Sequence, residues 1–376
     1  DKDAVLSSHA LSRGSVAVLA MDNLNHEDLI NNIRQIATDL DISLVSIESG
    51  FGTKELPDWG GRHFLLLQKP QIAILSHADF SSYDVGVTWW SIDQYLGIRH
   101  SQLNSSMAGY ADLRRYNTIV MPSGYADLNG PKKEALMTWV AQGGTLIAHN
   151  RSSRLIASTK DFGNVKLLQN TFENSLDYNF DLLKEMAASD NNINKAKTLA
   201  HGINLDINYP WESSNKQISE KELQNRDKWQ SIFMPSGSMV AGRVDQKHWL
   251  SFGTPSTLPI LYANFPILMT HDKTEAVVRI GELISNDEIK DFRMINWSSI
   301  PPGKDLNVRM SGLVWPEAAQ RIANSAYLTR ERIGRGQIIL FAGEPNFRGS
   351  TRGTNRLWLN ALIYGAGLGA STKINL

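Results

Sequence analysis

The spacing of apolar and polar residues divides the start of the chain into short strands and one helix. Ser15–Met21 has the pattern of an apolar strand, Glu27–Leu40 that of a helix, and Ile42–Ile47 that of a second strand. The Gly- and Pro-rich stretch Gly50–Gly61 has the composition of a turn-rich linker. Residues 1–66 are therefore predicted to form a small N-terminal β-α-β unit.

A second run of strands and helices occupies the rest of the chain. Its first three apolar strands are predicted at Gln71–Leu75, Thr118–Met121 and Thr145–Ala148. A helix that stops at Gly97 is expected after the first strand, and a helix that opens at Pro131 after the second. Such alternation favours a parallel sheet covered on both faces. Residues 67–376 are thus predicted to be an α/β domain, doubly wound, with a mainly parallel sheet.

A polar stretch at about 152–236 interrupts the alternation. It is rich in Asn, Lys and Glu, so we expect an excursion from the α/β domain that contains short helices. Added β segments and a C-terminal helix are predicted beyond it, at Met239–Val244, Leu258–Tyr262, Glu275–Ile280, Asn307–Met310, Gln337–Ala342 and about Thr354–Tyr364.

Composition excludes several classes of function. The 38 Lys and Arg balance the 38 Asp and Glu, and no basic run marks a nucleic-acid or anionic-membrane footprint, so a neutral or small partner is expected. The chain has no Cys, which removes disulfides, thiolate metal sites and every cysteine nucleophile. No apolar run reaches the ~20 residues that span a bilayer. We therefore expect neither a nucleic-acid partner nor a membrane span.

Familiar catalytic motifs do not occur in the sequence. It has no G-x-S-x-G, no Walker loop and no H-x-x-E, so neither a hydrolase elbow nor a zinc centre is indicated. Gly365–Gly369 imitates part of a dinucleotide fingerprint, but it follows a helix instead of joining a strand to a helix. We expect no metal or cofactor in this chain, and no catalytic residue is assigned from the motifs.

Polar residues do follow the predicted strands, and in an open parallel sheet ligands bind outside the carboxyl ends of the strands. One interpretation is a small-molecule cleft on this rim; the other is that these groups cap helices and bond to one another. Trp89 and Trp90 are expected to serve core packing more than binding. The candidate cleft residues are His77, Ser123, Tyr125, His149, Asn150, Arg151, Glu344 and Asn346.

Two segments resemble known families. MPSGY followed by ALMTWVAQGGTLIA, within Thr118–Ala148, resembles the class I glutamine-amidotransferase-like (flavodoxin-like) fold, in which a helix ending in Gly-Gly leads into the strand before the nucleophile elbow. MSGLVWPEAAQRIANSAYL and GRGQIILFAGEPNFRGSTRGTNRLWLNALIYG are similar to the C-terminal region of bacterial zinc-carboxypeptidase-like proteins of peptidase family M14. The second likeness covers nearly the whole chain and is weakest in the polar stretch.

The M14 resemblance implies a catalytic zinc domain upstream of this region. It therefore implies that the partner is an upstream carboxypeptidase domain of the same polypeptide, that the zinc lies there, and that the location is periplasmic or extracellular. Where the amidotransferase fold needs a Cys, this sequence has His149-Asn150-Arg151. The expected function is a non-catalytic, amidotransferase-like accessory module of an M14-family carboxypeptidase.

Two alternatives stay open. The rim could bind a small molecule, a peptide or a glycan, or support a residual hydrolase with a hydroxyl nucleophile such as Ser152 and a nearby base. The chain could also be an interaction protein that dimerises through aromatic surface.

Overall fold

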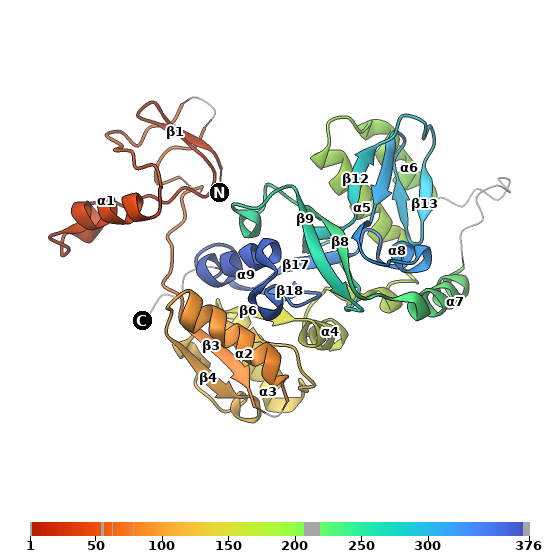
Figure 1. Ribbon diagram of the computed structural model, residues 1–376, viewed down its shortest axis with the longest axis horizontal. Helices are drawn as coiled ribbons and strands as arrows, with labels where there is room; N and C mark the ends of the chain where they lie inside the picture. The colour runs from red at the N-terminus through yellow and green to blue at the C-terminus, as the bar shows by residue number, and fades with distance from the viewer. Residues whose placement is uncertain (1, 54–55, 62, 78, 207–218, 371–376) are drawn as a thin grey trace. The chain divides into compact units, whose positions relative to one another are not determined.

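The chain divides into two compact units, Asp1–Leu66 and Leu67–Leu376. The computed structural model describes residues 2–370 except 54–55, 62, 78 and 207–218 (Figure 1). Part of the predicted polar excursion therefore lies outside the described residues. No described helix is long and apolar enough to cross a membrane.

The N-terminal unit contains a hairpin and one helix. Strands β1 (Ala4–Leu6) and β2 (His9–Leu11) pair antiparallel, and α1 spans Leu29–Asp39, inside the predicted helix. The predicted strands at Ser15–Met21 and Ile42–Ile47 are not strands, so the β-α-β arrangement is not confirmed. Their apolar side chains are largely exposed, and no described strand forms a ladder beside them. An apolar run needs such a neighbour to be stable as a strand.

The unit Leu67–Leu376 has an α/β fold built on one mixed sheet of 12 strands. Five strands run parallel in the order β18-β6-β5-β3-β4 (Figure 1). In chain order these strands are β3 (Ile72–Ser76), β4 (His100–Asn104), β5 (Thr118–Met121), β6 (Thr145–His149) and β18 (Gly336–Phe341). Numbered from β3, the order is 2-1-3-4-5, that of a doubly wound sheet.

The remaining strands join antiparallel, so the prediction of a mainly parallel sheet is wrong. The order continues from β18 through β17, β11 and β8 to β16, with β9 on β8 and with β10 and β7 beside β17. A tight turn between Ile333 and Gly336 joins β17 to β18, and a turn cannot make the crossover that parallel pairing needs. Their bounds are β7 Lys166–Leu167, β8 Ser236–Val244, β9 Thr257–Ala263, β10 Leu268–Met269, β11 Thr274–Ile280, β16 Arg309–Ser311 and β17 Ala326–Ile333.

Helices of the parallel part follow the predicted strands. The first, α2, is interrupted after Trp90 by a π-helical segment, Ser91–Tyr95, and the chain then turns at Gly97, whose φ is 64°. The indole Nε1 of Trp358 in α9 donates to Ser91 Oγ at 3.1 Å, which ties α9 to this segment. The helices are α2 Ser82–Trp90, α3 Gly130–Ala141, α4 Arg151–Ser158 and α9 Arg352–Tyr364.

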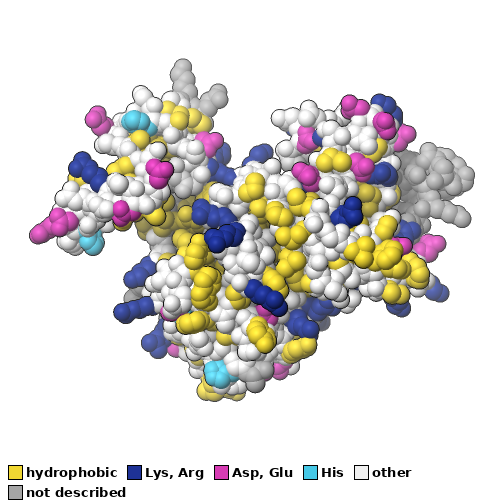
Figure 2. Space-filling view, viewed as in Figure 1, with side chains coloured by type: hydrophobic (Ala, Val, Ile, Leu, Met, Phe, Trp, Pro, Cys, Tyr) yellow, Lys and Arg dark blue, Asp and Glu magenta, His cyan; other side chains and the backbone are white. Residues whose placement is uncertain are grey.

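The predicted polar excursion contains helices and is followed by two small hairpins, β12 with β15 and β13 with β14. Their bounds, with those of α8, are α5 Ser175–Ser189, α6 Lys195–Asp206, α7 Glu220–Gln230, α8 Pro316–Ile322, β12 Glu282–Ser285, β13 Arg293–Ile295, β14 Ser298–Ile300 and β15 Lys304–Asn307. Figure 2 shows hydrophobic side chains gathered near α7 and α8, where Trp229, Ile232 and Trp315 are exposed.

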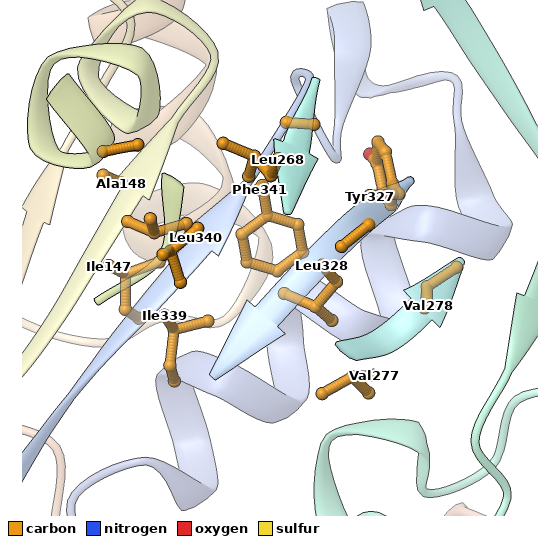
Figure 3. Packing of buried hydrophobic residues seen from close by; sticks show 14 of the residues in the cluster. Ile147, Ala148, Leu268, Val277, Val278, Tyr327, Leu328, Ile339, Leu340 and Phe341 are labelled. Carbon is orange, nitrogen blue, oxygen red and sulfur yellow. The ribbon is translucent and has the colours of Figure 1, made fainter. Parts of the chain in front are cut away.

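The hydrophobic core spans the junction of the parallel and antiparallel strands. Ile147 of β6, Leu340 of β18 and Leu328 of β17 are fully buried and belong to one cluster (Figure 3). Phe341, at the end of β18, lies in the same cluster. This packing fixes the ends of β6 and β18, from which several of the candidate residues follow.

Candidate functional site

The carboxyl end of β6 has the backbone geometry of a sharp strand-to-helix turn. Asn150, between β6 and α4, has φ 46° and ψ −108°. This conformation is strained for a residue with a Cβ. The amide of Asn150 donates to the Phe341 carbonyl at 3.0 Å, so the neighbouring strand holds the turn in place. The elbow expected at His149-Asn150-Arg151 thus has its strained residue at Asn150, whose side chain is not a nucleophile.

The serine hydroxyls that follow the turn are both committed to main-chain carbonyls. Ser152 Oγ donates to Pro122 O at 2.5 Å. Ser153 Oγ contacts Ala148 O at 2.9 Å and Phe341 O at 2.7 Å. Both side chains are fully buried. Ser152 therefore supports the turn structurally, and the geometry does not offer it as a nucleophile.

Next to the turn, two of the candidate residues meet in the interior. His149 Nδ1 lies 3.3 Å from Glu344 Oε1, and both side chains are buried. The imidazole is packed edge-on against Trp358, with ring centroids 4.6 Å apart, and against Phe341 at 5.6 Å. The surrounding aromatic rings shield this pair from a dissolved substrate.

Asp84 of α2 joins this pair, and the sequence analysis missed it. Burial and the nearby Glu344 carboxyl raise the pKa of Asp84 to about 6, although the Ser81 hydroxyl and His149 act in the opposite direction. In the sequence, Asp84 is only an acid in the first turn of a helix, which the helix dipole alone explains. Its proximity to Glu344 depends on the pairing of distant strands, which no local pattern reveals.

Other candidate residues divide between structural and exposed positions. The buried amide of Asn346 donates to Val87 O at 3.3 Å and Ser91 Oγ at 3.0 Å, so it fastens α2 to the end of β18. The guanidinium of Arg151 lies over the ring of Tyr125, 4.2 Å from its centroid. Both of these side chains are exposed. The eight residues therefore do not form a single cleft.

The crevice between β3 and β5, where the strand order reverses, is bridged by backbone. Phe80 and Gly124 form an isolated antiparallel bridge. The Ser81 amide donates a hydrogen bond of 2.9 Å to the carbonyl oxygen of Ser123, a buried residue. A Cβ on Gly124 would lie 2.3 Å from the Asp79 carbonyl, so the approach requires glycine. This position is the usual ligand crevice of such sheets. Here its backbone groups bond to one another.

Beside it, a pocket of about 570 Å³ lies at the carboxyl ends of β3 and β4 and against α2. His77 is exposed, has φ 83°, and its Nδ1 lies 3.0 Å from Ser76 Oγ. Trp89 is partly buried and packs against the core, as expected, and it also lines the pocket, whereas Trp90 is 42% exposed. The lining residues are Ser76, His77, Phe80, Ser82, Val85, Gly86, Trp89 and Gln102.

The described part of the chain contains no group of three or more His, Cys, Asp or Glu side chains that could hold a metal ion. Among the residues that line the β3–β4 pocket, His77 is the one with an ionisable side chain. The pocket therefore offers hydrogen bonds and an aromatic surface instead of fixed charge.

Comparison with known proteins finds structural similarity at low sequence identity. No family model matches the chain, and no curated protein matches it. Among solved structures, a ThuA-like protein from Bacteroides uniformis is 11% identical, with a TM-score of 0.38 over 78% of this chain and 90% of that one. A ThuA-like protein from Parabacteroides merdae is 10% identical, with a TM-score of 0.39 over 82% and 93%. A cytoplasmic protein from Salmonella typhimurium is 10% identical, with a TM-score of 0.37 over 78% and 98%.

These findings overturn the assignment to peptidase family M14. No M14 family model matches the chain, and the similar structures named above are ThuA-like or cytoplasmic proteins instead of carboxypeptidases. The upstream carboxypeptidase domain, its zinc and the periplasmic or extracellular location were implied by that resemblance alone. They stay untested predictions, and the α/β fold stands on the strand order of the chain itself.

Proposed function

We propose that this chain is a non-catalytic domain with a class I glutamine-amidotransferase-like core, and that it binds an uncharged polar small molecule in the β3–β4 pocket. The observation that carries the proposal is the strained turn after β6, whose residue Asn150 lies where an amidotransferase-like fold would have its nucleophile. The hydroxyls of Ser152 and Ser153 donate to carbonyls, so neither replaces it.

The chemistry of the pocket supports an uncharged ligand. Gln102 and Ser82 supply groups that can donate and accept hydrogen bonds, while Trp89 supplies an apolar surface. No lining residue carries a fixed charge, so a strongly charged ligand would lose its hydration without gaining an ion pair. A monosaccharide and a nucleoside both meet these requirements.

A residual hydrolase is the second candidate, and the geometry disfavours it. The His149–Glu344 pair is buried, and the nearby hydroxyls of Ser152 and Ser153 are bonded to main-chain carbonyls. The experiment below separates the two candidates because it measures both binding and turnover on the same protein.

The test uses ligand-observed NMR on the purified chain with neutral monosaccharides and nucleosides as probes. Gln102→Ala should weaken the binding of a bound probe, while Gln94→Ala, the same change at an exposed position outside the pocket lining, should leave it unchanged. Hydrolysis of glutamine and of p-nitrophenyl acetate should stay at the rate without protein. Turnover that is lost in His149→Ala would refute the non-catalytic proposal, and binding that is unaffected by Gln102→Ala would refute the pocket.

A further inference from the structure

The β3–β4 pocket is lined on one side by one face of α2, and a glycine lies within that face. The lining residues of the helix are Ser82, Val85, Gly86 and Trp89. Residues spaced three and four positions apart lie on the same side of an α-helix. Gly86 is exposed, and a Cβ on it would meet no atom of the described residues within 4 Å. A side chain at position 86 would therefore extend into the pocket.

The backbone and packing of the described chain do not account for this glycine. A glycine inside a helix is less favourable than alanine because its unfolded backbone has more freedom to lose. Elsewhere a glycine has a positive φ, as at Gly97, or a close neighbour, as at Gly144, whose Cβ would lie 2.5 Å from the Trp139 ring. Gly86 has neither among the described residues, and the irregular part of the helix begins only at Ser91. What the glycine provides is open space in the pocket.

The side chains beside this space are held in place by the sheet. Val85 and Trp89 are partly buried and pack against the hydrophobic core. Gln102 on the edge strand β4 and Ser82 on α2 supply hydrogen-bond donors and acceptors. A ligand in the pocket can contact the bare helix backbone at Gly86 and the apolar ring of Trp89. A ring with an apolar face and hydroxyl groups on its edge matches this surface.

We propose that Gly86 determines which ligands the β3–β4 pocket accepts, by letting a flat hydroxylated ring lie against the backbone of α2. Because Gly86 lines that same pocket, this role rests on the proposed function. A methyl group at position 86 would hold the ring off the helix, and a gap of about 0.5–1 Å already removes roughly a quarter to a half of the dispersion attraction. Alanine at position 86 would therefore stabilise the helix and weaken binding at the same time.

Ligand-observed NMR titrations of the full chain test this role with methyl α-D-glucopyranoside, uridine and sorbitol. The first two probes are hydroxylated rings of different origin, and sorbitol carries hydroxyl groups without a ring. We expect at least one ring probe to bind the parent chain saturably and sorbitol to show no binding. Gly86→Ala should weaken the binding of that ring probe by roughly tenfold or more, the cost of an extra methyl group in a packed contact.

Thermal unfolding separates a role in binding from a role in the fold. Gly86→Ala should melt at a higher temperature than the parent chain, although it binds more weakly. The matched control is Gly353→Ala, the same change in α9 outside the pocket lining, which should bind like the parent.

Two kinds of failure are distinguishable. If a ring probe binds the parent and folded Gly86→Ala binds it with unchanged affinity, the role of Gly86 is refuted while the pocket stands. The same holds if sorbitol binds as tightly as the rings, or if Gly86→Ala loses stability and binding together. If neither ring probe binds the parent, the proposed function fails and the role of Gly86 fails with it.

Discussion

Replacing Asp84 by Asn should stabilise the protein at neutral pH. The carboxyl of Asp84 is half-buried near Glu344, and its pKa rises from an ordinary 3.8 to about 6 because of burial and the Glu344 carboxyl. Between these two values the folded chain binds more protons than the unfolded chain, so stability falls as pH rises from about 4 to about 6. Above pH 6 the folded protein bears the full cost of an ionised Asp84.

The size of this cost follows from the shift. A rise of about two pH units at about 1.36 kcal/mol each corresponds to about 3 kcal/mol. Asp84 keeps partial access to solvent, and screening lowers the figure to about 1–2 kcal/mol. Asn keeps the shape of the side chain, and its amide can donate to the Glu344 carboxylate, so the variant avoids the cost without creating a cavity.

Urea unfolding followed by tryptophan fluorescence at pH 4, 5, 6 and 7.5 measures the effect. We expect Asp84→Asn to exceed the parent by about 1–2 kcal/mol at pH 7.5 and to match it near pH 4. Asp287→Asn, an exposed control, should follow the parent at every pH. The reasoning is refuted if Asp84→Asn is no more stable than the parent at pH 7.5, or if the two differ equally at pH 4 and pH 7.5.

Four further substitutions give distinct outcomes. Gly124→Ala should lower the unfolding free energy by roughly 2 kcal/mol, because the new Cβ would meet the Asp79 carbonyl. Gly86→Ala, in α2, should raise it by about 1 kcal/mol, because nothing lies within 4 Å of the new Cβ. Urea unfolding that changes the stability of both variants in the same direction would contradict this. Asn150→Gly should raise the free energy of unfolding by about 1 kcal/mol, and with it the melting temperature, because glycine adopts this φ without strain. A lower melting temperature would show that the Asn side chain supports the turn. The pKa of Glu275 is lowered to about 2, since contacts with His248 and Arg330 outweigh the effect of burial. Glu275→Gln should therefore lower the unfolding free energy by up to about 1 kcal/mol at pH 7, and by progressively less as pH falls from about 4.5 toward 2. An equal loss of stability at pH 3 and pH 7 would contradict this.

Local sequence patterns predicted four of the five parallel strands and missed β4, whose residues HSQLN form no apolar run. β5 runs from Thr118 to Met121 as predicted, and β3 and β6 differ from their predicted ranges by one residue. These strands are buried on both faces, so each is a short apolar run. β17 was missed because YLTRERI mixes apolar and charged residues, and its position depends on pairing with β18 across a turn. The prediction of a strand at Ser15–Met21 was wrong although the segment is an apolar run, because such a run also needs a partner strand to pair with.

The candidate site was predicted only in part. Reading the strand ends identified His149 and Glu344, which the structure brings to 3.3 Å of each other. It gave no indication that both are buried, because burial there comes from Trp358 of the distant α9. Asp84 and Trp89 were not assigned to a site, since in the sequence they are ordinary residues of an amphipathic helix.

The π-helical segment Ser91–Tyr95 also constrains how the length of this region can change. A π turn holds more residues than an α turn, so deleting one residue from the segment would allow an ordinary α-helix to continue from α2. Every residue beyond the deletion would then rotate by about 100° around the helix axis. If Ser91 were deleted, Ile92, now fully buried, would leave its place in the core, and a deletion anywhere in the segment would bring the chain to β4 out of phase. Insertions and deletions at this point are therefore coupled to the pairing of β4, an edge strand of the sheet.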